Sequence, residues 1–153
     1  MKKLIVAAMV VVLSACGGGD NMAEVTYFRN GDESLVEGNI LLMWVNYQTE
    51  DGQDLLRTRP QEPLAMLYDS SSVEQSGLIK GIIDDLKIGD SVAFSIPSKN
   101  LWEVSFNRPL PDTIGENSSI LVNLGIVNQM TKPEYNSYMG ELEMKRNAAY
   151  YEA

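Results

Sequence analysis

The residues that could perform chemistry in this chain are few, because it contains no histidine and a single cysteine, Cys16. This composition excludes a disulfide within the chain, a histidine-based nucleophilic triad, a His–Cys metal site and imidazole acid–base catalysis. Asp84 and Asp85 have no partner base, so we interpret them as a solvated face. The remaining candidates are two aromatic side chains that carry hydrogen-bond donors, Tyr47 at a predicted strand end and Trp102 in a predicted loop.

Two predicted strands would position these rings. Residues 40–47 are apolar on both faces until the strand end, which is typical of a strand inside a sheet and places Tyr47 on one of its sides. Residues 91–97 alternate apolar with small or polar residues, the pattern of a half-buried strand that Pro97 ends. For Tyr47 a core position at the strand end remains the alternative to a role in a site.

A short helix is predicted between these strands and ends at Gly89. Its apolar face consists of residues spaced i, i+3, i+4 and i+7, which are Ile79, Ile82, Ile83 and Leu86. A helix with such a face packs it against a sheet, so the simplest interpretation is that these four residues belong to the hydrophobic core.

The rest of the chain predicts further strands and a terminal helix. Residues 25–28 favour an edge strand, 64–68 a short strand, and 119–130 a last strand with alternating apolar positions. Residues 100–119 form a long loop with two prolines, and loops of that length are usually functional. Thr131 and Glu134 are spaced as a capping box that starts a helix. These elements predict an α+β fold with mostly antiparallel pairing.

The N-terminus predicts export and lipidation. Two lysines, an apolar run and the residues "LSAC" resemble a bacterial signal peptide with a lipobox, which makes residues 1–15 the signal peptide and Cys16 the acylated N-terminus. A plain signal peptide with an incidental cysteine is the alternative. Residues 16–36 would form the lipidated tether. We therefore expect a lipid-anchored protein of the bacterial cell envelope, at the outer membrane and facing the periplasm or the surface.

Composition and net charge indicate which partners the protein is expected to bind. The 153 residues are 44% hydrophobic and 22% charged, as expected for one globular domain. The net charge of −9 becomes more negative when Lys2 and Lys3 leave with the signal peptide. Such a charge repels phosphate backbones, so nucleic acid is not expected as a partner.

Four ordered blocks resemble the FKBP-type peptidyl-prolyl isomerases across residues 38–128. The blocks read "VNYQTEDG", "LIKGIIDDLKIGD", "IPSKNLW" and "NSSILVNLGIV". The resemblance implies an FKBP-like antiparallel sheet wrapped around one short helix in residues 37–130. The tail "MTKPEY" resembles the helical extension of lipoprotein members, here residues 131–153.

The family implies chemistry that needs neither metal nor cofactor. Rotation of an X-Pro bond must break amide resonance, a barrier of ~18–20 kcal/mol, and a dry apolar pocket favours the twisted amide over the planar one. The resemblance assigns catalytic roles to Tyr47, Ile79 and Trp102. It assigns the lining of the substrate pocket to Leu55, Leu64, Met66, Leu78, Ile82 and Val122.

The pocket departs from the family pattern, because aliphatic residues replace several aromatic walls. Leu55 and Leu56 stand where the family has Phe-Asp, so a carboxylate is missing too. Losing packing surface worth ~1–3 kcal/mol per ring could lower catalysis by orders of magnitude. Three functions therefore remain open: an isomerase that assists folding of proline-containing polypeptides, a non-catalytic holdase, and a structural lipoprotein of a surface complex.

Overall fold

The computed structural model describes residues 23–58, 62–69 and 78–152. The predicted signal peptide and Cys16 lie outside these residues. The elements in chain order are β1 (Ala23–Phe28), β2 (Glu33–Ser34), β3 (Ile40–Thr49), β4 (Asp54–Arg57), β5 (Leu64–Leu67), α1 (Leu78–Asp84), β6 (Lys87–Ile88), β7 (Ser91–Pro97), α2 (Ser98–Asn100), the π-helical turn η1 (Leu101–Ser105), β8 (Ser119–Met130) and α3 (Lys132–Tyr151).

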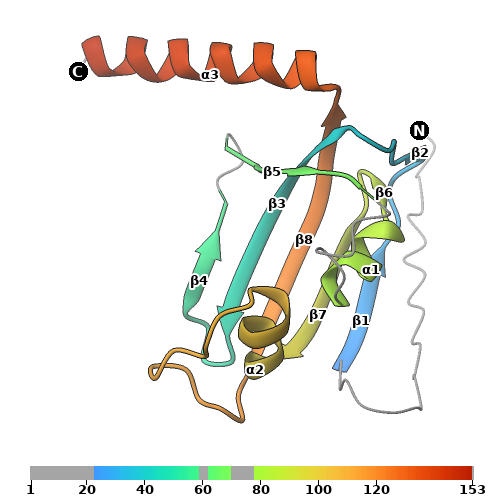
Figure 1. Cartoon of the computed structure of the whole chain (residues 1–153), viewed down its shortest axis with the longest axis vertical. Helices are drawn as coiled ribbons and strands as arrows, with labels where there is room; N and C mark the ends of the chain where they lie inside the picture. Colours follow the sequence, from blue (N-terminus) through green and yellow to red (C-terminus); the bar gives the residue numbers. More distant parts are fainter. Residues whose placement is uncertain (1–22, 59–61, 70–77, 153) are drawn as a thin grey trace, which may run out of the picture.

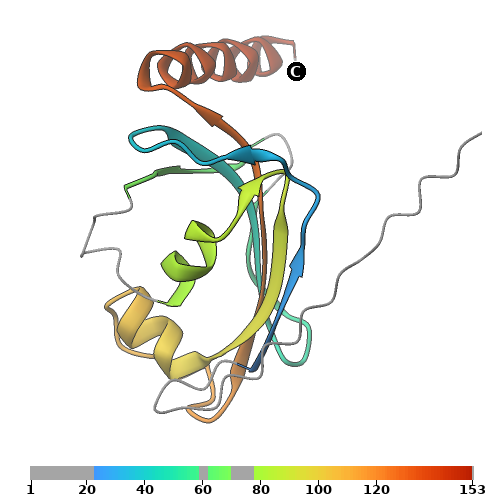
Figure 2. The same cartoon turned by 90° about the vertical axis from the view of Figure 1, so that its right-hand side faces the viewer.

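One antiparallel sheet organises the molecule. Its strand order is β1-β7-β8-β3-β4, and β5 pairs with β3 beyond the end of β4. Figures 1 and 2 show the sheet curving around α1 and the α2 segment, which both lie on its concave side, while α3 extends beyond one end of the sheet. The predicted α+β class, with a sheet wrapped on one short helix and a C-terminal helix, is confirmed.

The core lies between α1 and the concave face of the three central strands. Alternate residues of β7 and β8 point into it, as their sequence pattern predicts, because side chains alternate between the two faces of a strand. Each fully buried aliphatic side chain contributes about 1.5–3 kcal/mol to folding. The least exposed core side chains are Leu41, Ile96, Leu101, Ile120, Leu124, Ile126, Val92 and Val122.

Two boundaries differ from the sequence prediction. The edge strand predicted over 25–28 is confirmed as β1, but it begins at Ala23 and pairs with β7, so the sheet starts inside the range 16–36 predicted as a tether. The helix ends at Asp84 rather than at Gly89. Gly89 has φ +97° and instead lies in the tight turn between β6 and β7, a conformation that favours glycine.

A buried carboxylate holds this turn. Asp90 is 1% exposed and accepts hydrogen bonds from the backbone N–H groups of Gly31 (2.8 Å) and Lys87 (3.0 Å). The Arg29 guanidinium lies 3.4 Å from the same carboxylate and also donates to the Asp85 carbonyl. Asp90 therefore ties the segment after β1 to the β6–β7 turn.

The C-terminal helix α3 starts with the predicted capping box. The Thr131 side chain accepts from the Glu134 N–H, and the Glu134 carboxylate accepts from the Thr131 N–H at 2.8 Å. The sequence also spaces Tyr135, Tyr138, Met139 and Leu142 as a loose apolar stripe along this helix, but no residue of α3 is buried. Tyr135, Tyr138 and Leu142 are half-buried, and Met139 is exposed. The helix start is thus specified locally, without support from a core.

Replacing Glu134 with alanine is expected to unravel the first turn of α3. The hydrogen bond from the Thr131 hydroxyl, and then that from its backbone, lower the pKa of Glu134 below 4.5, so capping is complete above pH 4.5 and is lost as the pH falls through the lowered value. Far-UV circular dichroism should show less helix in Glu134→Ala at neutral pH, and the wild type should lose the same signal on acidification. Glu141→Ala, in the middle of the helix, should leave the signal unchanged.

Candidate functional site

The candidate site begins with the excursion between β7 and β8. Its base is closed by the Ser98 N–H, which donates to the Ser118 carbonyl at 2.9 Å, and by the two hydroxyls, which are 2.7 Å apart. Ser98 is fully buried, so its polar groups can no longer bond to water, and the hydrogen bonds to Ser118 replace those bonds. The two ends of the excursion are thereby fixed against the sheet.

Within the excursion, residues predicted as an irregular loop form the helical turn η1. Leu101 is 1% exposed and anchors the turn in the core. Its carbonyl accepts from the Phe106 N–H at 3.0 Å, which is the wider i to i+5 spacing of a π-helix, and such turns are frequent at functional sites. Asn107 follows with φ +50° and ends the turn. Trp102 is therefore held on a helical turn, which corrects the predicted loop.

Three aromatic rings meet at the rim of the core, and we call Tyr47, Trp102 and Phe106 the ring cluster. The Phe106 ring centroid lies 6.1 Å from that of Tyr47 and 5.9 Å from that of Trp102. Both contacts are edge-to-face, at interplanar angles of 85° and 80°, a geometry that stabilises aromatic pairs. Tyr47 on β3 and Trp102 on η1, which are far apart in the sequence, are thus joined through Phe106.

Tyr47 reaches the cluster from β3, where it stands in register with Leu56 of β4 and Val122 of β8. Burial among apolar neighbours raises the pKa of the Tyr47 phenol above its usual value of 10. The phenol therefore stays protonated throughout the neutral range. It remains a neutral hydrogen-bond donor, and Trp102 offers a second donor through its indole N–H.

The third predicted catalytic residue, Ile79, lies in the first turn of α1 and packs half-buried against the same core as Tyr47 and Trp102. Two predicted pocket residues, Ile82 and Val122, are 3% and 1% exposed. They are core residues, so they can contribute only as the floor of a site.

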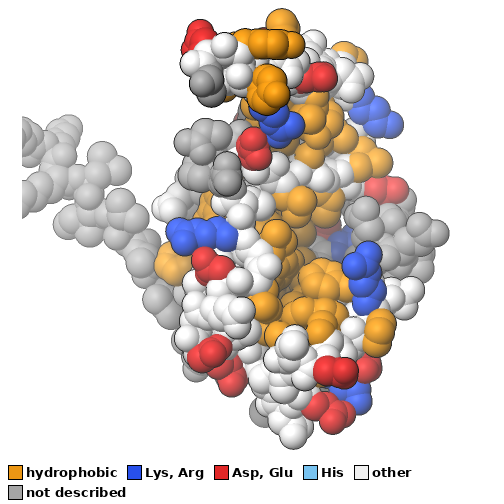
Figure 3. Space-filling view, turned by 90° about the vertical axis from the view of Figure 1, so that its left-hand side faces the viewer, with side chains coloured by type: hydrophobic (Ala, Val, Ile, Leu, Met, Phe, Trp, Pro, Cys, Tyr) orange, Lys and Arg blue, Asp and Glu red, His pale blue; other side chains and the backbone are white. Residues whose placement is uncertain are grey.

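The other predicted pocket residues divide by exposure. Leu55 and Met66 are partly buried against the core, whereas Leu64 on β5 is 43% exposed. The side chain of Leu78 lies outside the described part of the structure. Figure 3 shows hydrophobic side chains gathered in a band down the face on the β4 side of the molecule, so this side of the sheet presents apolar surface to solvent.

Phe106 is the site residue that the sequence prediction missed. It follows Trp102 by four residues, the spacing that places two side chains on the same face of a helical turn. That signal was hidden because the prolines of the same segment indicate a loop. The aromatic content of the site is therefore higher than the resemblance alone implies.

Among the described residues, no three His, Cys, Asp or Glu side chains are grouped so that they could hold a metal ion. Across 23–58, 62–69 and 78–152, the helices also lack the length and hydropathy needed to cross a bilayer. What the ring cluster can offer is an apolar surface with oriented donors.

Comparison with known proteins gives similarity in structure only. No family model and no curated protein sequence matches the chain. It is similar to FkpA from Escherichia coli, with a TM-score of 0.49 and 14% identity over 70% of this chain and 47% of FkpA, so it spans about half the length of that protein. It is also similar to the N-terminal domain of FKBP42 from Arabidopsis thaliana, with a TM-score of 0.46 and 13% identity over 78% of this chain and 99% of that domain. Neither similarity identifies an activity.

Proposed function

We propose that this protein is an exported lipoprotein that binds proline-containing segments at the ring cluster and accelerates rotation about their X-Pro bonds. The observation that carries the proposal is the meeting of Tyr47, Phe106 and Trp102 at the rim of an apolar core, with two hydrogen-bond donors among the three rings. The sequence blocks that resemble FKBP-type isomerases contain Tyr47 and Trp102. A chain without histidine suits a reaction that needs no proton transfer.

The mechanism follows from the polarity of the twisted amide. A planar amide is conjugated and strongly polar, whereas the twisted amide has lost its conjugation, so an apolar surface favours the latter. The Tyr47 hydroxyl, the Trp102 indole N–H and the backbone N–H of Ile79 would orient the substrate carbonyls. The first N–H groups of a helix have no acceptor within the helix, which leaves that of Ile79 suited to this role.

Turnover is expected to be slow. Ile82 stands where the resemblance places an indole floor, and Leu55 where it places a phenylalanine. Phe106 compensates for part of this loss by adding a ring from η1. We therefore expect a measurable but modest acceleration of X-Pro isomerisation.

The direct test uses a proline-containing tetrapeptide and exchange spectroscopy by NMR, which measures cis–trans interconversion at equilibrium. Addition of catalytic amounts of the protein should increase the exchange rate in proportion to its concentration. Heat-denatured protein at the same concentration is the control. An exchange rate that stays at the uncatalysed value would reject the isomerase.

A holdase is the second candidate, favoured by the exposed apolar side chains in and around the ring cluster. Phe106 is 41% exposed, Val104 is 63% exposed, and Leu56, in register with Tyr47, is 44% exposed. Such a surface can bind an unfolded chain without accelerating rotation about its X-Pro bonds. Absence of acceleration together with saturable binding of an unfolded polypeptide would establish this alternative.

The proposed lipid anchor gives a separate prediction. If Cys16 is acylated, the wild type should incorporate a fatty-acid analogue and fractionate with membranes, whereas Cys16→Ser should incorporate none. Cys16 is the only cysteine, so no other thiol can take the label. Equal labelling of the two proteins would contradict the anchor and leave the fold unaffected.

A further inference from the structure

The outer face of the sheet carries a hollow that the proposed function does not use. Its volume is about 370 Å³, and it lies over β3 and β8 beside Thr58 and Pro63. Met43 and Val45 of β3 point into the core, so the intervening Trp44 faces the opposite side of the sheet. The hollow is therefore separated from the ring cluster by the thickness of the sheet.

Trp44 supplies an aromatic wall of fixed orientation. Its indole covers Gly125, its partner on β8, so closely that a Cβ at this glycine would lie 2.4 Å from the indole Nε1. Any residue larger than glycine at this position would displace the ring. The side chain nevertheless keeps 37% of its surface exposed, which leaves indole surface available in the hollow.

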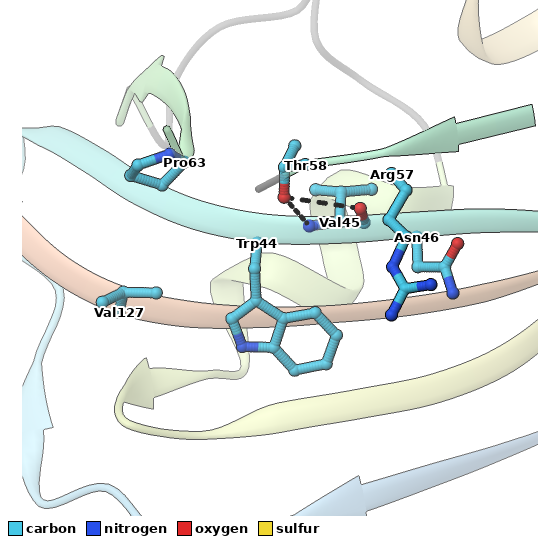
Figure 4. Close-up of a pocket in the computed structure, with 7 residues that line it drawn as sticks. All are labelled: Trp44, Val45, Asn46, Arg57, Thr58, Pro63 and Val127. Atoms are coloured by element: carbon cyan, nitrogen blue, oxygen red, sulfur yellow. Dashed lines mark hydrogen bonds between the residues drawn. The ribbon is translucent and has the colours of Figure 1, made fainter. Parts of the chain in front are cut away.

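The hollow has an apolar end and a polar end. Figure 4 shows Pro63 and Val127 to one side of the indole, and the Asn46 amide and Arg57 guanidinium to the other. The Asn46 Oδ1 atom is buried and has no hydrogen-bond partner among the described residues. Because this oxygen is buried, a ligand in the hollow does not contact it, and the hydrogen-bonding group that the polar end offers is the exposed Arg57 guanidinium.

Charge excludes most ionic ligands from this face. The three central strands β3, β7 and β8 contain no charged residue at all, although 22% of the chain is charged. Among the described residues that line the hollow, Arg57 is the single cation, and the Asp54 carboxylate lies 3.6 Å from its guanidinium. Together with the net charge of −9, this disfavours an anionic ligand.

Backbone pairing disfavours an extended peptide. Such a peptide binds a sheet by adding hydrogen bonds to unpaired backbone groups. At the hollow both groups of Val45 are already used, because its N–H donates to Thr58 Oγ1 at 2.9 Å and its carbonyl accepts from the Thr58 N–H at 3.0 Å. A ligand must instead be recognised by the side chains.

We propose that this hollow binds a sugar ring of a neutral glycan. A pyranose has an apolar face of C–H groups, which suits the indole of Trp44, and a rim of hydroxyls that both donate and accept hydrogen bonds. The hydroxyls can accept hydrogen bonds from the several N–H donors of Arg57. Apolar contact with a few oriented polar groups is the usual composition of a small-molecule site.

The test is saturation-transfer NMR on the purified full-length chain with three neutral disaccharides: maltose, cellobiose and N,N′-diacetylchitobiose. At least one should receive saturation, most strongly at the C–H protons of one ring. Trp44→Ala should weaken its binding at least tenfold, and Arg57→Ala should weaken it too. Leu121→Ala removes an exposed apolar side chain of β8 outside the hollow and should bind like the wild type.

Two results would overturn the glycan site: no transfer to any of the three sugars, or equal transfer in wild type and Trp44→Ala. Should Trp44→Ala fail to fold, Arg57→Ala provides the same comparison, because that side chain is 71% exposed. Displacement of the sugar by an apolar peptide would instead identify a surface for protein docking and would also reject the proposal. Trp102→Ala, which alters only the ring cluster, should still bind the sugar, so failure of the proposed isomerase function is distinguishable from failure of this one.

Discussion

Replacing Asp90 with alanine is expected to lower the free energy of unfolding by about 3–5 kcal/mol, the usual cost of removing one partner from a buried charged network. The carboxylate is 1% exposed and accepts from two backbone N–H groups, those of Gly31 and Lys87. Without it both N–H groups would lose their acceptor, and a hydrogen bond to a charged group contributes about 1.5–3 kcal/mol. The Arg29 guanidinium would also lose its carboxylate partner.

Urea denaturation followed by circular dichroism measures this change. Asp112→Ala removes an exposed carboxylate and should leave the midpoint of unfolding unchanged. Asp90→Asn keeps one side-chain oxygen as an acceptor and should therefore lie between the wild type and Asp90→Ala. A midpoint for Asp90→Ala within error of the wild type would show that the network contributes nothing to stability.

Replacing Trp102 with alanine is expected to reduce the proposed isomerase activity at least tenfold, which corresponds to about 1.4 kcal/mol in the barrier. The substitution removes both the edge-to-face contact with Phe106 and the indole donor. Trp102→Phe restores a ring but no donor, so it should recover only part of the rate. Exchange spectroscopy with the same proline-containing tetrapeptide gives the rates.

The matched control is Trp44→Phe, because Trp44 lies on the opposite face of the sheet. Its isomerase rate should equal that of the wild type, with the same circular dichroism spectrum. Full activity in Trp102→Ala would show that the indole of Trp102 takes no part in catalysis and would contradict the proposed mechanism. An equal loss of activity in both variants would indicate damage to the fold rather than to the site.

The central strands were predictable because their alternation has a physical cause. One face of β7 and β8 packs on α1, and the apolar residues therefore recur at every second position. The capping box of α3 was predictable for a similar reason, since Thr131 and Glu134 satisfy each other locally. Patterns of this kind depend only on neighbours in sequence.

The features that the sequence did not reveal depend on distant contacts. The turn η1 forms because Leu101 is buried and because Ser98 and Ser118 close the excursion, neither of which is visible in the local pattern. Phe106 enters the site only once that turn exists. The hollow beside Trp44 likewise requires Gly125 on a strand about 80 residues away, whose lack of a side chain gives the indole its place.

The pairing of β3 with β8 has a consequence for the order of folding. These neighbours at the centre of the sheet join Ile40 to Met130 and Thr49 to Ile120, so they come from opposite parts of the chain. Contacts between residues so far apart in sequence form slowly, because a large loop must close first. A chain emerging in N-to-C order must therefore present most of its length before its central ladder can assemble. Until then the apolar strand β3 is without its main partner and is a natural target for chaperones.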